Sequence, residues 1–142
     1  MKIMMDQKGV AVVEFAIVLP VLLVILFGIV EFSLVMYNKA IVTNASREGA
    51  RAGIVQGSPR PSANEIRSVV TNYLATVPPI TFGGPGLATP TVSAQCSAFG
   101  QDLIVGVTYT YQFLVLPNVI QLLNGTLTQS IDLVATTVMK CE

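Results

Sequence analysis

The chain has 142 residues, of which 52% are hydrophobic and only 11% charged, and its 8 basic and 8 acidic side chains cancel. Soluble domains carry roughly 25% charged residues, so this chain has too few charges to cover a soluble sphere of its size. Without a basic excess it has nothing to hold a phosphate backbone, which argues against nucleic-acid binding. High hydrophobicity with no net charge also excludes intrinsic disorder.

The composition argues against both catalysis and metal binding. There is no histidine, so the chain lacks both the ordinary general base near neutral pH and an imidazole metal ligand. Its two cysteines, Cys96 and Cys141, are too few to close a zinc site. No phosphate-binding glycine motif follows a predicted strand. We therefore expect a protein that is not an enzyme and that binds no metal or cofactor.

The first predicted element is one long helix over about residues 10–55. Within residues 10–30 the only ionisable side chain is Glu14, and largely apolar sequence continues to residue 37. As a helix, residues 10–37 would measure about 42 Å, which exceeds the hydrocarbon core of a bilayer at about 30 Å. The region is too long for a secretory signal peptide, and no Ala-x-Ala site follows it. We interpret it as a tilted membrane span whose outer end leaves the bilayer.

The rest of the chain predicts a small α+β domain beyond a Gly/Ser/Pro-rich boundary at residues 56–61. A second helix begins after Ser62, because Ser62 and Glu65 have the capping-box spacing, and it ends at Pro78. One amphipathic helix against a three-stranded antiparallel sheet would make a two-layer fold. The strands are predicted from alternating apolar and polar residues at 91–97, 105–115 and 126–141, with a connection at 117–125 that has room for one helical turn.

The segment around Gly9 is the most specific feature of the sequence. A short basic leader ends at Gly9, an apolar helix begins at Val10, and Glu14 stands alone five residues after the glycine. This pattern resembles the processing site of type IV pilin-like proteins, which a prepilin peptidase cuts after the glycine. A longer pattern is similar to the TadE-like pseudopilins of tight-adherence pili: EFAIVLP at 14–20, FGIVE at 27–31 and ASREGARA at 45–52.

The resemblance implies a minor pilin-like subunit that takes part in assembly of an adhesion-type pilus. It divides the chain into a leader (1–9), a long N-terminal helix with a transmembrane half (10–56) and an extracytoplasmic domain (57–142). Expected partners are the prepilin peptidase, other pilins through the N-terminal helix, and the bacterial inner membrane, with the N-terminus cytoplasmic. Two alternatives remain: an unprocessed single-span anchor with a binding domain, or a major filament-forming pilin.

Glu14, Pro20 and Glu31 are the residues of the predicted span that need an interpretation. Cleavage would create an ammonium group at Val10, and Glu14 of a neighbouring subunit would neutralise it; alternatively, Glu14 reaches the cytoplasmic headgroups. Pro20 removes an amide and clashes with a carbonyl one turn earlier, so we expect a kink or local melting there. Such a site either helps to extract a pilin-like helix from the bilayer or is an ordinary proline of a membrane helix. Glu31 is expected to be an interfacial charge at the outer edge.

A stripe of small residues follows the span, where Ala45, Gly49 and Gly53 repeat every four residues. Such a stripe lets another element approach the helix backbone closely. That element is either the chain's own sheet or another subunit. Arg47 and Arg51 repeat likewise on a different face, and we count them as part of a candidate helix interface.

The two cysteines are predicted to form a disulfide. Cys96 and Cys141 fall at the ends of the first and third strands, which run in the same direction in a three-stranded meander. Two cysteines in an extracytoplasmic domain favour a bridge. It would stabilise the small domain by about 4 kcal/mol according to the chain-entropy model.

Overall fold

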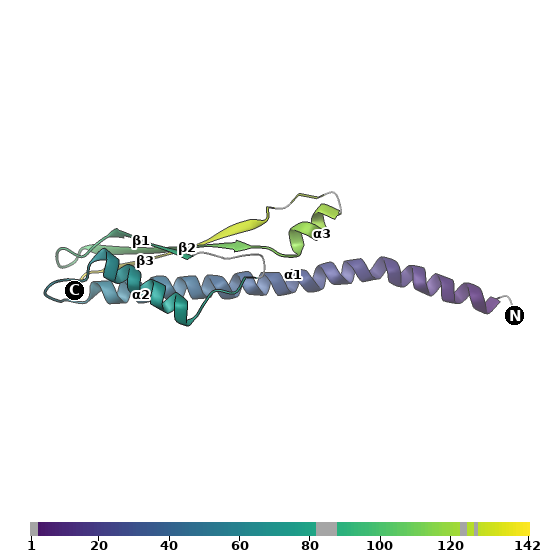
Figure 1. Cartoon of the computed structure of the whole chain (residues 1–142), viewed down its shortest axis with the longest axis horizontal. Helices are drawn as coiled ribbons and strands as arrows, with labels where there is room; N and C mark the ends of the chain where they lie inside the picture. Colours follow the sequence, from purple (N-terminus) through teal and green to yellow (C-terminus); the bar gives the residue numbers. More distant parts are fainter. Residues whose placement is uncertain (1–2, 82–87, 123–124, 127) are drawn as a thin grey trace.

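The computed structural model describes residues 3–81, 88–122, 125–126 and 128–142. It has the predicted α+β fold, a long N-terminal helix followed by a small helix-and-sheet domain (Figure 1). The elements in chain order are α1 (Ile3–Ile54), α2 (Ala63–Thr76), β1 (Ala88–Ala94), β2 (Asp102–Gln112), α3 (Leu116–Leu122) and β3 (Ser130–Lys140).

Helix α1 has two different environments along its length. Its N-terminal half projects alone from the molecule, whereas its C-terminal half lies along one face of the sheet, with α2 beside it (Figure 1). The helix is continuous through Pro20, and Figure 1 shows its axis arching gently over the N-terminal part. It begins before Gly9, so the predicted leader boundary lies inside the helix.

The sheet is an antiparallel meander with strand order β1-β2-β3. On β2 the predicted alternation is confirmed from Val105 to Tyr111, where every second residue is buried. The strand itself runs from Asp102 to Gln112, about three residues earlier than the predicted 105–115. Strand β3 begins at Ser130, later than predicted, because Ser130 pairs with Gln112, the last residue of β2. The chain leaves the sheet there to enter α3, which is the helical turn allowed for in the 117–125 connection.

The hydrophobic core joins α1, α2 and the sheet. The predicted capping box of α2 is confirmed: the Ser62 hydroxyl accepts from the Glu65 amide, and the Glu65 carboxylate accepts from the Ser62 amide at 2.7 Å. The hydrophobic core itself contains residues of α1 as well as residues from 57–142. Its members are Val35, Ile41, Val42, Ala45, Ala50, Ile66, Val70, Leu74, Leu103, Val105, Val107, Tyr109, Tyr111, Leu133, Ala135 and Cys141.

Candidate assembly helix and its outer domain

The N-terminal part of α1 presents an apolar surface that the described chain does not cover. Val10 is 66% exposed and Phe15 63%, and most of the apolar residues from there to Val30, itself 46% exposed, are exposed as well. Helix α1 is long and apolar enough to cross a membrane, with a mean hydropathy of 3.0 in its most apolar window. Exposed apolar surface of this extent calls for lipid or another protein around it.

Gly9, Val10 and Glu14 lie together on this bare surface. Val10 and Glu14 are one helical turn apart, and they line one shallow hollow with Gly9, Val13 and Ile17. Among the described residues, Glu14 has no hydrogen-bond or ion-pair partner. Its carboxylate is therefore open to a partner from outside the chain. The processing role of Gly9 and Val10 and the kink at Pro20 stay predictions.

The small-residue stripe faces the chain's own domain. A Cβ added at Gly49 would lie 2.5 Å from Val70 Cγ2, and one at Gly53 would lie 2.5 Å from Leu103 Cδ2. Ala45, the first residue of the stripe, is fully buried as well. Two candidates were considered for the element that packs on the stripe, the chain's own sheet and another subunit. The chain's own domain occupies it, through α2 and β2. The backbone of α1 comes so close to them because glycine has no side chain.

Arg47 and Arg51 lie on the outer surface of α1. Both are exposed, as is Glu48 between them, while Ala45 and Gly49 beside them are buried. The two arginines thus occupy a different face from the stripe, as the four-residue spacing predicted. Their part in a subunit interface stays a prediction.

Glu31 has a role that the sequence did not reveal. It is only 3% exposed, and its Oε1 accepts hydrogen bonds from the amides of Leu114 at 2.8 Å and Val115 at 2.7 Å. Its Oε2 accepts from the amide of Leu116 at 3.1 Å. Glu31 is therefore not a free surface charge, because the chain returns from β2 and encloses the carboxylate. A glutamate inside an apolar helix was the only available signal.

Asn38 binds the segment around Ile80, which is distant in sequence, to α1. It is fully buried, its Nδ2 donates to the carbonyl of Ile80 at 2.6 Å, and its Oδ1 accepts from the amide of Ile80 at 2.8 Å. One side chain therefore satisfies both backbone groups of Ile80 as a neighbouring strand would. Nothing in the local sequence marked Asn38 for this contact.

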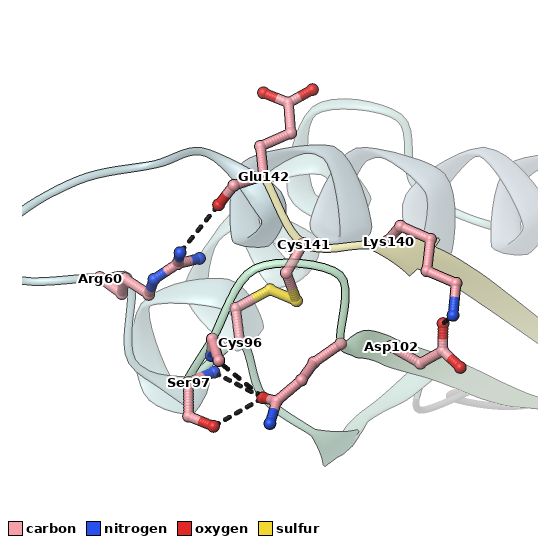
Figure 2. Close-up of a disulfide and its surroundings, with 9 residues drawn as sticks. Arg60, Cys96, Ser97, Asp102, Lys140, Cys141 and Glu142 are labelled. Atoms are coloured by element: carbon pink, nitrogen blue, oxygen red, sulfur yellow. Dashed lines mark hydrogen bonds and ion pairs between the residues drawn. A yellow bond between two sulfur atoms is a disulfide. The ribbon is translucent and has the colours of Figure 1, made fainter.

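The predicted disulfide between Cys96 and Cys141 is confirmed, with a Cα–Cα distance of 5.6 Å (Figure 2). Strand β2 lies between β1 and β3, so the chain bends after Lys140 to reach Cys96. Two backbone hydrogen bonds hold this bend, from Cys141 to the Gln101 carbonyl and from Gly100 to the Cys141 carbonyl. The Gln101 side chain also accepts from the Ser97 hydroxyl at 2.6 Å. The distal end of the sheet is thus held by covalent and polar contacts together.

Three ionisable groups within residues 57–142 have pKa values that their surroundings shift. Burial raises the pKa of Tyr109, an effect that the Thr81 side chain partly offsets. Burial also raises the pKa of Tyr111, and the negative charge of Glu31 adds to the increase. Hydrogen bonds from the amide and hydroxyl of Ser62 lower the pKa of Glu65. Near neutral pH the two tyrosines are therefore neutral and Glu65 is charged.

Comparison with known proteins places this helix in a family context. Residues 9–51 match the family model of TadE-like proteins. The match confirms the resemblance over the apolar part of α1 and over Ala45 and Gly49, while Gly53 lies just beyond the matched residues. TadE-like proteins are a pilus-related structural family, and the match spans less than a third of this chain. No curated protein and no solved structure matches the chain.

Proposed function

We propose that this chain is a minor pilin-like structural subunit, processed after Gly9, that takes part in assembly of an adhesion-type pilus. The observation that carries the proposal is the TadE-like match, which begins at Gly9 and covers the exposed apolar helix. A helix that is bare along its N-terminal half is suited to packing first against lipid and then against other pilin helices.

The proposed mechanism is associative and not catalytic. Cleavage after Gly9 would leave an ammonium group on Val10, and Glu14 of a neighbouring subunit would pair with it. A carboxylate among apolar side chains is costly until it finds a cation, so this pairing would favour association of correctly processed subunits. The N-terminus would be cytoplasmic and the domain of residues 57–142 outside, a placement that the disulfide supports because such bonds persist in oxidising compartments.

Cleavage is tested by the intact mass of membrane-extracted protein. In a host with the matching prepilin peptidase, we expect a chain that begins at Val10, and in a host without that peptidase the full chain. Recovery of only the full chain from the first host would contradict processing and favour the unprocessed anchor. Dominance of the protein in sheared surface fractions would instead indicate a major pilin.

The role of Glu14 is tested with Glu14→Gln, which keeps the shape of the side chain and removes its charge. We expect normal insertion, cleavage and disulfide formation, with co-purification of other pilins reduced about tenfold or more, which corresponds to roughly 1.4 kcal/mol or more. Glu142→Gln is the matched control, since Glu142 is exposed and the C-terminus lies at the opposite end of the molecule from the N-terminus (Figure 1). Wild-type assembly by processed Glu14→Gln would rule out the charge pair.

A further inference from the structure

The connection between β2 and β3 lies against the outer end of the apolar part of α1. Figure 1 shows α3 over α1, on the side of the sheet that faces the N-terminal half of the helix. A Cβ added at Gly28 would lie 3.9 Å from Leu116 Cδ2, and Glu31 accepts hydrogen bonds from the amides of the two residues before α3 and of its first residue. The covered face of α1 accordingly starts inside the apolar segment, where Phe27 and Gly28 are partly buried while Ile29 and Val30 are exposed.

The depth of this contact follows from helix geometry. A hydrocarbon core of about 30 Å takes about 20 helical residues, so a span that begins at Val10 ends near Val30. Gly28 and Glu31 then lie at the outer boundary of the bilayer, together with the chain fastened to them. Tilting the helix would move both residues deeper, because a tilted span uses more residues.

The chemistry of the connection suits that depth. From residue 103 to residue 131 the sequence contains no Asp, Glu, Lys or Arg. Leu114 is 46% exposed, while Asn118 and Gln121 supply exposed polar groups. The amides of residues 114–116 are satisfied by Glu31, and Asn118 Nδ2 donates to the Leu114 carbonyl at 2.8 Å. Backbone with satisfied hydrogen bonds can leave water at little cost.

We propose that residues 114–121 form a second membrane contact, seated at the acyl–headgroup boundary of the outer leaflet. Leu114 enters the edge of the acyl region, as the apolar face of an interfacial helix does, and the amide side chains remain among the headgroups. The outer domain then rests on the bilayer at α1 and at this connection, which limits how far it can tilt or rotate about the span. The proposal depends on the membrane-spanning role proposed for α1.

Tryptophan fluorescence can test the contact, since the chain contains no tryptophan of its own. Leu114→Trp is placed in the otherwise unchanged full-length protein, reconstituted at one copy per lipid nanodisc. Val138→Trp is the water control, because Val138 is 56% exposed on β3 toward the disulfide end. Ile17→Trp is the lipid control, because Ile17 is 68% exposed in the middle of the apolar segment.

For Leu114→Trp we expect blue-shifted emission, quenching by lipids labelled near the headgroup, and an acrylamide quenching constant about threefold or more below that of Val138→Trp. Acrylamide quenching equal to that of Val138→Trp, with Ile17→Trp quenched by deep lipid labels, would overturn the contact and leave the span intact. Shielding of Leu114→Trp from both lipid and water would overturn it too, in favour of burial within the protein. Failure of lipid to quench Ile17→Trp would instead contradict the span itself.

Discussion

Two buried polar side chains of α1, Glu31 and Asn38, each hold a distant part of the chain in place. Glu31 accepts hydrogen bonds from three backbone amides that lie 83 to 85 residues away in sequence. Asn38 forms hydrogen bonds with both the N–H and the carbonyl of Ile80, 42 residues away. In a weakly polar interior such bonds are strong, and leaving one of their partners unpaired is costly. These two residues therefore fix where the connections between elements cross the long helix.

Glu31→Gln should loosen the start of α3. The substitution replaces one accepting oxygen with an amino group that faces backbone N–H groups, at a cost of about 1.5–3 kcal/mol. Hydrogen exchange at the amides of residues 114–116 should accelerate by about ten- to a hundredfold. Glu48→Gln, at an exposed position of the same helix, should leave it unchanged. Equal protection in both variants would mean that Glu31 does not hold these amides.

At the level of elements, the close approach of α1 to α2 and β2 depends on missing side chains. Gly49 and Gly53 leave room for Val70, Leu103 and Ile66 to touch the helix backbone. Glycine lowers the stability of a helix interior by up to about 1 kcal/mol relative to alanine, so the packing gained here offsets a local cost. The stripe serves the fold of this chain, and Arg47 and Arg51 lie on a different, exposed face of α1.

Gly49→Ala should destabilise the domain by about 1–3 kcal/mol, as overpacking does. Its new methyl group would meet Val70 Cγ2 at 2.5 Å and Val105 Cγ1 at 3.2 Å, and β-branched valines have little rotamer freedom to move away. Thermal unfolding of the full-length protein in detergent measures the effect. Gly28→Ala is the control, because the nearest atom there lies 3.9 Å from the added carbon. If both variants melt like the wild type, the close packing is not real.

In the whole molecule, a single helix provides both the exposed apolar segment and part of the core of the α+β domain. Its first half is bare, and its second half contributes Val35, Ile41, Val42, Ala45 and Ala50 to the core. The disulfide and the Glu31 contact then hold opposite ends of the sheet. Any movement of the C-terminal half of α1 would therefore carry the α+β domain with it as one body.

Fragments can test this sharing of α1. A fragment of residues 29–142 retains every core residue and should unfold in one cooperative transition. A fragment of residues 57–142 retains the sheet and disulfide but loses the α1 part of the core, and should show no cooperative transition in calorimetry or circular dichroism. Both are compared under non-reducing conditions. Cooperative unfolding of the shorter fragment at the same temperature would show that residues 57–142 form an independent domain.

The sequence by itself determined the features that local spacing encodes. These are the long apolar helix with its lone Glu14, the capping box at Ser62, the alternation along β2 and the TadE-like pattern. The disulfide could also be predicted, because two cysteines allow only one pairing within the chain. Helix periodicity, strand alternation and capping depend on residues a few positions apart, so they can be read without knowing how the elements pack.

Only the tertiary structure decided what faces each side of α1. Glu31, Asn38 and the start of β3 were not predictable, because their partners lie 42 to 85 residues away or on another strand. The stripe of small residues predicted a close contact but not its partner. A helix presents the same bare stripe to its own sheet or to a neighbour, and the direction in which the chain returns after Pro61 and after Gln112 settles which one occupies it.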